Sequence, residues 1–422
     1  MRRAVAEAAG GERYIDGASE TNSMAEAHVP SSPHAGDADT FSPVDNEPPL
    51  RWQRALHLAP AGGLGVGRRA IFFALLSWLP IALWAFLSGR FVEAATGEPL
   101  LQHYGVHARC LLVIPLLILG EASLHKAALF YIPQFIRNGL VDPAARPRLE
   151  AALRAVRRWR DASLPWVFVL GGAVAWTIAD RPMADADADA MSWALEQGGA
   201  LGFGGLWFAY VVRPIFIALL LGWIWRIFLL TVLFGKLGRL GLSLVPTHPD
   251  RAGGLGFLEK IPAAFAPVTF ALSAMLASRW AHEIVHHGQT LQSLKAPAAA
   301  FVVVWTLLLL APLFALMPAL RAAKRAALPA YSALVAKQGR LVRRQWIDGE
   351  ADAESPMIEP AGVGPIADAA TMYDAVRSMR SLPVGKASFV GILGPIVVPM
   401  LVVASLQIPA RDLLLKLLKT LL

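Results

Sequence analysis

Long apolar runs alternate with short polar connectors along most of the chain. A helix needs about 20 mostly apolar residues to cross a hydrocarbon layer of about 30 Å, and several runs reach that length. We expect an all-α fold, a polytopic transmembrane bundle of about seven helices, with six to eight as the permitted range. The expected crossings are 70–88, a second around 110–120, 164–179, 203–225, 263–280, 298–320 and 388–408.

The second crossing is the hardest to bound, because its apolar centre of 11 residues, Cys110 to Gly120, is too short to span. It must extend either back through Arg109 and His107 or forward past Glu121 to Phe130. The forward extension, or a compromise, places the Glu121 carboxylate within the membrane or near its cytoplasmic boundary.

Polar segments divide the chain into four parts. Residues 1–50 are acidic and poor in large apolar groups, so they cannot offset the entropy of folding and are expected to form a disordered cytoplasmic tail. The remaining parts are 51–320, with about six crossings and cytoplasmic connectors at 131–163 and 235–262; 321–387, a cytoplasmic basic helix and linker; and 388–422, the last crossing and a Leu-rich interfacial helix.

Composition agrees with this division. The chain is 55% hydrophobic and 17% charged, which is too apolar for a soluble domain of 422 residues. Connectors assigned to one side carry 29 Lys and Arg residues against seven on the other. The positive-inside rule then predicts a cytoplasmic N-terminus and a periplasmic C-terminus. Residue usage rich in Ala, Gly and Arg favours a bacterial inner membrane.

The same basic connectors bear on partners. The net charge of +8 follows membrane orientation, so we expect the lipid bilayer as partner, with anionic lipid at the cytoplasmic face, and no nucleic acid. Protein partners are not indicated. The single cysteine, Cys110, excludes an intrachain disulfide and a cysteine-based metal site.

Two charges appear at membrane depth. Arg213 falls near the middle of the fourth crossing and is followed by Pro214, which frees a carbonyl one turn earlier. An embedded arginine needs a partner or a wet cavity, and Glu121 is the candidate at similar depth. The pair either lines an ion or substrate pathway or pins two helices together, and an arginine that snorkels is a further alternative.

A His-Glu-x-x-His pattern, His282-Glu283-x-x-His286, follows the fifth crossing. On a helix it places two imidazoles on one face to bind zinc, with the glutamate as general base. These five residues resemble the zincin signature and the intramembrane site-2 protease family, and the resemblance implies His282 and His286 as ligands and Glu283 as base. That family's third ligand, an aspartate on a later crossing, has no match. The alternatives are an outward-facing metal site and a polar outer loop of solvated histidines.

The connector Thr247 to Leu258 is rich in glycine. Gly253, Gly254 and Gly256 would let the backbone approach a ligand, but no Gly-Lys-Ser/Thr follows and no strand precedes, so a P-loop and a dinucleotide site are excluded. It is either a flexible turn re-entering the membrane or a cytoplasmic gate or binding loop in which His248 and Asp250 act.

One wider resemblance is present. The run from Trp223-x-Trp225-Arg226 to Val245-Pro-Thr-His-Pro-Asp-Arg-Ala-Gly-Gly-Leu-Gly-Phe-Leu258 is similar to that of a group of bacterial multi-pass inner-membrane proteins. It covers mainly residues 201–260. The resemblance implies a membrane location and no particular activity.

Three functions follow from these features. Transport or conduction of a small solute or ion is favoured by the embedded charges and the proline-broken helix. A non-catalytic membrane scaffold or sensor is the alternative. The third is an outward-facing metal site or zinc metallopeptidase on His282, Glu283 and His286, with zinc as the one cofactor considered; enzymatic activity is not favoured.

Overall fold

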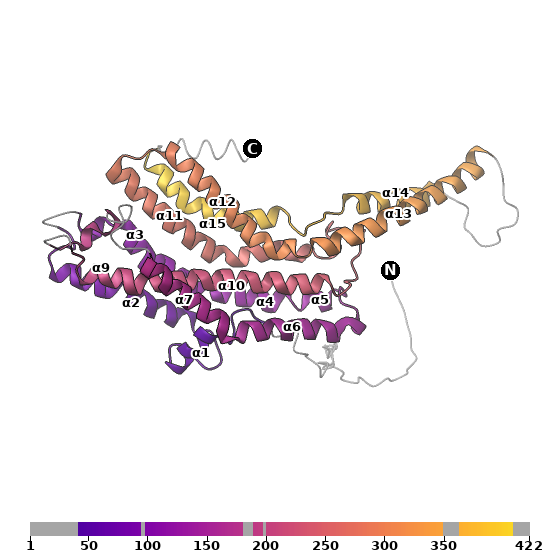
Figure 1. The fold of residues 1–422 in the computed structure, drawn as a ribbon. Helices are drawn as coiled ribbons and strands as arrows, with labels where there is room; N and C mark the ends of the chain where they lie inside the picture. Colours follow the sequence, from indigo (N-terminus) through magenta and orange to yellow (C-terminus); the bar gives the residue numbers. More distant parts are fainter. Residues whose placement is uncertain (1–40, 94–97, 180–188, 197–199, 349–362, 408–422) are drawn as a thin grey trace, which may run out of the picture. The chain divides into compact units, whose positions relative to one another are not determined.

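The fold is a bundle of long helices (Figure 1). The computed structural model describes residues 41–93, 98–179, 189–196, 200–348 and 363–407. Within these ranges every regular element is a helix, apart from one isolated bridge between Leu195 and Leu201. The expected all-α class is therefore confirmed. The far N-terminal tail, the acidic residues after Ala179 and the C-terminal Leu-rich helix lie outside the described residues.

Six helical segments are long and apolar enough to cross a membrane. They are α2 (Val66–Leu87); α3 (Tyr104–His107), η3 (Ala108–Val113), α4 (Ile114–Tyr131) and α5 (Gln134–Arg137) in line; α9 (Phe203–Trp207), η6 (Phe208–Val212) and α10 (Arg213–Gly238); η7 (Gly256–Phe265) and α11 (Ala266–His287); α12 (Leu291–Phe314); and α15 (Lys386–Ser405).

A seventh crossing depends on a bent pair of helices. The pair is α6 (Arg146–Asp161), which η4 (Pro143–Ala145) precedes, and α7 (Ser163–Ala179), with a bend of 41° at the break. α7 coincides with the expected third crossing, and α6 falls within the expected connector 131–163 as an amphipathic helix that buries Leu149, Leu153 and Val156.

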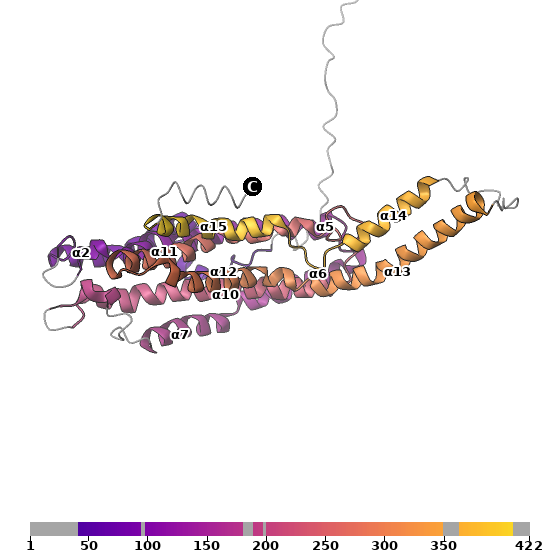
Figure 2. The same cartoon turned by 90° about the horizontal axis from the view of Figure 1, so that it is seen from above.

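The remaining elements lie before and between these spans. They are α1 (Pro48–Ala55), η2 (Leu100–Gln102), η5 (Asp189–Ala194), α13 (Met317–Val342), η8 (Arg343–Ile347) and α14 (Val363–Ser378). α13 packs along α14, as both ribbon views show (Figure 1, Figure 2).

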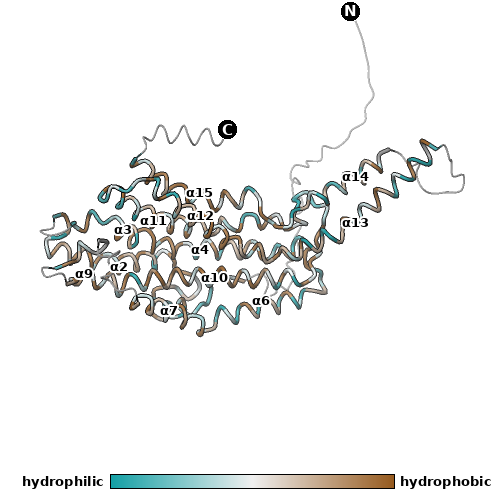
Figure 3. Tube along the Cα trace, turned by 45° about the horizontal axis from the view of Figure 1, so that its top comes forward, coloured by the Kyte–Doolittle hydropathy of each residue, from teal (hydrophilic) through white to brown (hydrophobic). Residues whose placement is uncertain are grey.

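Outer faces of the bundle are apolar and uncovered. Phe86, Phe168 and Val390 expose 70% or more of their surface, although each lies on a long apolar helix. Hydropathy colouring shows the same: the helices α2, α10, α12 and α15 are predominantly hydrophobic, whereas α13 and α14 carry more polar positions (Figure 3). Soluble proteins rarely expose such continuous apolar surface, so lipid is the solvent of these faces.

The bundle has two chemically distinct ends. At the first, which we call the basic end, α2, α11 and α15 begin and α4 and α10 finish (Figure 1). At the second, the histidine end, α11 finishes with His286 and His287. α4 lies centrally, in contact with α2, α10 and α11, so the bundle encloses its buried face, which carries Glu121.

Two sequence expectations need correction. Residues 41–50 were expected in the disordered tail, but Phe41, Val44 and Leu50 are buried, and Phe41 and Val44 belong to the core of the bundle. The histidines after Trp280 were considered as an outer loop, yet α11 continues through His287 and ends at Gly288 in a left-handed conformation. Helices here extend further into polar sequence than their apolar runs indicate.

Candidate functional site

Three constellations could carry function, and the first is a buried charge cluster around Glu121. Its two carboxylate oxygens are each taken by a guanidinium: Arg69 Nη1 lies 2.5 Å from Oε2, and Arg226 Nη2 lies 2.8 Å from Oε1. All three residues are almost completely buried. Arg69 also donates to the side chain of Gln53 and to the carbonyl of Leu64.

The predicted ion pair between Glu121 and Arg213 is therefore wrong. Arg213 precedes Arg226 by 13 residues on α10, about 20 Å along a helix that rises 1.5 Å per residue. It is buried elsewhere in the bundle and has interactions of its own. Two tryptophans just before an arginine, as in Trp223-x-Trp225-Arg226, are typical of a membrane-interface anchor. Trp223 is nevertheless fully buried and donates to the Leu117 carbonyl at 3.0 Å.

A second carboxylate completes the cluster, and it comes from the N-terminal segment. Glu47, directly before α1, accepts from Arg226 Nη2 at 2.7 Å and from its Nε at 3.1 and 3.2 Å. Burial raises the pKa of Glu47 to about 7, and the Arg226 guanidinium opposes that shift. Arg226 thus helps to retain a negative charge that would otherwise be costly at this depth.

With two carboxylates and two guanidiniums the cluster is balanced in charge. It joins the segment before α1 to α2, α4 and α10 through the contacts of Glu47, Arg69, Glu121 and Arg226. The four charges are buried and paired with one another. This arrangement favours the alternative in which the embedded charges pin helices together.

The second constellation is the glycine-rich loop at the basic end. The Asp250 carboxylate accepts from three backbone N–H groups: Ala252 at 2.7 Å, Gly254 at 3.2 Å and Gly256 at 2.7 Å. A methyl group at Gly256 would lie 2.7 Å from Cβ of Asp250, so only glycine fits there. His248 Nδ1 lies 2.9 Å from the same carboxylate.

The loop is also tied to the segment between α14 and α15. Arg380 donates from its backbone N–H to the Arg251 carbonyl at 2.7 Å, and from its guanidinium to the Asp250 carbonyl at 2.8 Å and to the Glu259 carboxylate. Gly253 and Gly254 adopt positive φ values of 66° and 95°, which glycine permits without strain. The carboxylate of Asp250 is occupied in closing the loop, which weighs against both a flexible turn and a ligand-binding role for Asp250.

Replacing Asp250 by alanine is expected to cost about 2–4 kcal/mol, because three N–H groups lose a charged acceptor. Burial opposes ionisation, yet these N–H bonds outweigh it and lower the pKa of Asp250 below 3.8. With the folded-state pKa depressed, the stabilisation is complete above about pH 4 and is lost on further acidification. Thermal unfolding in detergent measures both effects.

The control for this variant is Asp142→Ala, since Asp142 caps one N–H group, that of Ala144 at 2.8 Å. Loss of a single cap costs about 1 kcal/mol. Equal destabilisation by the two substitutions would show that Asp250 does not organise the loop.

The third constellation lies at the histidine end and contains the predicted His282 and His286. One helical turn apart on α11, their rings lie 4.6 Å from centroid to centroid. Glu98, in the loop before η2, reaches both: its Oε2 lies 3.5 Å from His282 Nε2 and its Oε1 lies 3.3 Å from His286 Nδ1. The ligand atoms of the three residues all lie within 4.8 Å of one another.

These spacings fit a shared ion. Ligands about 2.0–2.2 Å from a tetrahedral zinc ion are about 3.3–3.5 Å from one another, close to the separations of the Glu98 oxygens from the two imidazoles. Two of the atoms that face each other, Glu98 Oε2 and His282 Nε2, are buried without a hydrogen-bond partner among the described residues. Buried polar atoms are normally satisfied, so this pair favours a shared ligand at the cluster.

Surrounding groups shape the cluster. His103, at the start of α3, stacks on His282 with 5.2 Å between centroids, and its Nε2 lies 3.6 Å from Glu98 Oε2 and 3.2 Å from the Ser192 hydroxyl. The Tyr104 ring lies against both His282 and His286. The contact of α3 with α11 thus brings Glu98 to the α11 histidines.

Glu283, the expected general base, is not part of this cluster. Its carboxylate accepts from Arg279 Nε at 3.1 Å, one turn earlier on α11. Among the described residues the three-ligand group is Glu98, His282 and His286. Sequence reasoning found the two histidines from their spacing but missed Glu98, which no local motif marks.

The fold and its lipid-facing surface define the class: this is a multi-pass α-helical membrane protein. Comparison with protein-family models, with curated proteins and with solved structures gives no match. Functional inference therefore rests on the constellations themselves.

Proposed function

We propose that this membrane protein binds a divalent transition-metal ion, zinc foremost, through Glu98, His282 and His286 at the histidine end of the bundle. The observation that supports it is the convergence of three ligand groups at metal-ligand spacing with buried atoms that lack hydrogen bonds. The positive-inside asymmetry favours an outward-facing position for this end.

The ligand set favours zinc over other ions. Two imidazoles and one carboxylate suit zinc and its neighbours, whereas calcium and magnesium require mostly oxygen ligands and copper(I) prefers sulfur. Three protein ligands leave a fourth position open, as in zinc sites that exchange a water or a substrate, rather than in closed structural sites. His282 is only 12% exposed at its side chain and Glu98 is 27% exposed, so an ion would remain accessible from one side.

Neither the peptidase nor the transport hypothesis has comparable support. A general base must lie within hydrogen-bond reach of the metal-bound water, and Glu283 is engaged with Arg279 instead. The transport hypothesis required an embedded charge facing a wet pathway, and the Glu121 carboxylate is enclosed by two guanidiniums.

Metal content tests the proposal. The full chain, purified in detergent, is equilibrated with zinc, freed of unbound ion and compared with the double variant His282→Ala/His286→Ala. We expect about one zinc per wild-type chain and less than a tenth of that in the double variant, since two of three ligands are removed.

The matched control is His57→Asn, which removes an exposed imidazole far from α11. Residue 57 has a positive φ of 60°, a conformation that asparagine tolerates. The control should retain the wild-type stoichiometry. Zinc retained in the double variant, or absent from the wild type after loading, would overturn the proposal.

A further inference from the structure

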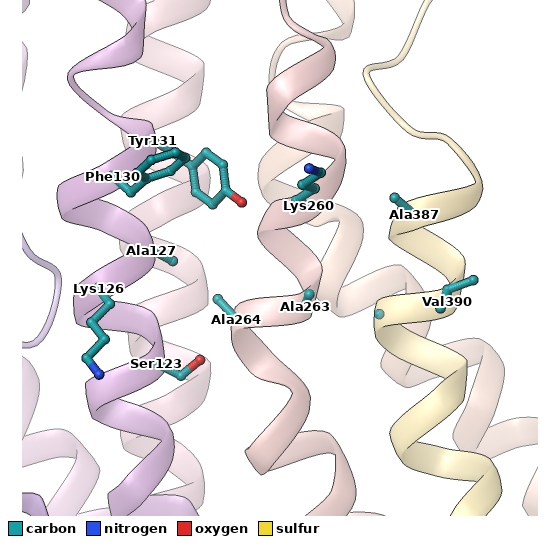
Figure 4. A pocket seen from close by; sticks show the side chains of 11 residues that line it. Ser123, Lys126, Ala127, Phe130, Tyr131, Lys260, Ala263, Ala264, Ala387 and Val390 are labelled. Atoms are coloured by element: carbon teal, nitrogen blue, oxygen red, sulfur yellow. The ribbon is translucent and has the colours of Figure 1, made fainter.

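A groove opens on the side of the bundle at the basic end, away from the metal cluster. It lies between α4, η7 and α15 and has a volume of about 560 Å³ (Figure 4). That size is within the range of about 300–1,000 Å³ typical of small-molecule sites. Its lining residues are Ser123, Lys126, Ala127, Phe130, Tyr131, Lys260, Ala263, Ala264, Ala387, Val390 and Gly391.

Small apolar residues form the body of the groove. Gly391 of α15 packs so closely on Ala263 of η7 that an added methyl group would lie 3.0 Å from Ala263 Cα. Phe130 and Val390, exposed by 58% and 70%, flank the opening. An apolar surface of this kind on a membrane bundle accommodates a hydrocarbon chain.

Positive charge lines the same groove. Lys126 on α4 and Lys260 on η7 are both exposed. Neither side-chain ammonium group has a hydrogen bond or ion pair within the described part of the chain. The lining contains no carboxylate, and the Tyr131 hydroxyl points into the gap on the side of Lys260 (Figure 4). Lysines beside lipid are costly unless they reach the headgroup level or an anionic partner.

Charge and shape together select the occupant. Lys126 lies in the last turns of α4 and Lys260 in the first turns of the η7–α11 span. Figure 4 shows Lys260 on the side of the Tyr131 hydroxyl, whereas the Lys126 side chain points away from Lys260 along α4. The groove therefore combines an apolar body with positive charge on two of the elements that line it.

We propose that this groove binds one anionic phospholipid. Its phosphate lies at the Lys260 ammonium on the side of the Tyr131 hydroxyl, the Lys126 ammonium adds positive charge on the α4 side of the groove, and one acyl chain lies along Ala127, Ala263 and Val390. Lysine acts on phosphate as a point charge, so the site selects for negative headgroup charge rather than for a particular headgroup shape.

The test is lipid binding to the full chain by native mass spectrometry from detergent, with phosphatidylglycerol and phosphatidylcholine of identical acyl chains. The wild type should retain phosphatidylglycerol in preference. Lys126→Gln/Lys260→Gln should bind it about 30-fold more weakly, since a lysine near the surface contributes about 1 kcal/mol and tenfold corresponds to about 1.4 kcal/mol.

Two further variants keep the result decisive. Lys295→Gln/Lys337→Gln removes the same charge from exposed positions on α12 and α13 and should bind like the wild type. Ala387→Trp, at an exposed position in the first turn of α15, fills the groove with both lysines intact and should also lose the lipid. Equal binding of the two lipids, or equal loss in both lysine pairs, would overturn the proposal in favour of non-selective annular lipid.

Discussion

Replacing Glu121 by alanine is expected to destabilise the bundle by about 3–5 kcal/mol. The change leaves the guanidiniums of Arg69 and Arg226 buried with one carboxylate, Glu47, between them. A buried charge that loses its partner retains its full desolvation cost, which is why breaking such pairs is strongly destabilising. Thermal unfolding in detergent should show a midpoint lower by roughly 3–6 °C.

Glu283→Ala is the matched control. It removes the same side chain from an exposed pair with Arg279, one turn apart on α11. Exposed pairs of this type contribute about 0.3–0.5 kcal/mol, so the midpoint should barely move. If Glu121→Ala unfolds at the same temperature as Glu283→Ala, the buried cluster does not hold the helices together.

Replacing Glu98 by alanine is expected to lower zinc affinity by about 100-fold or more while leaving the fold intact. Glu98 supplies the anionic ligand, and without it two imidazoles remain with the ion's full charge uncompensated. The Glu98 side chain is partly exposed and lies in a loop, so its removal leaves no buried charge without a partner. Zinc titration of the purified chain measures the affinity.

For this experiment Glu283→Ala is again the control, since it alters the glutamate of the His-Glu-x-x-His pattern. Its carboxylate contacts Arg279 rather than the cluster, so zinc affinity should stay at the wild-type value. The reverse outcome, with Glu283→Ala weakened and Glu98→Ala unchanged, would contradict the proposed ligand set, because it would make Glu283 rather than Glu98 the acidic ligand.

The sequence predicted the fold well because membrane helices are determined by the length and polarity of local runs. Crossings such as 70–88 and 388–408 correspond closely to α2 and α15. Boundaries shifted where helices continue into polar residues: α11 runs through the histidines to His287, and α12 already begins at Leu291. Tertiary contacts stabilise these extra turns, and hydropathy does not register them.

The charge cluster was predicted in part. Glu121 could be recognised as embedded because it interrupts an apolar run, but its partners could not. Arg69 directly precedes the expected crossing 70–88 and Arg226 directly follows 203–225, positions typical of the membrane interface, while Glu47 fell in the expected tail. The membrane depth of a residue, estimated from its place in the sequence, does not reveal that a segment before the first crossing folds back against α10.

The metal cluster was also predicted only in part. Spacing of four residues on a helix identified His282 and His286, because such residues share one face. Glu98 could not be found this way, since its approach depends on the packing of α3 against α11. Local periodicity predicts which side chains share a helix face, and only the fold determines what lies opposite them.

The most direct test of the account is X-ray absorption spectroscopy of the zinc-loaded full chain at the zinc edge. The account predicts a first shell of nitrogen and oxygen at about 2.0–2.1 Å with outer-shell scattering from two imidazoles, and loss of the imidazole scattering in His282→Ala/His286→Ala. A first shell of oxygen alone in the wild type, or a spectrum unchanged in the double variant, would contradict a zinc site built on Glu98, His282 and His286.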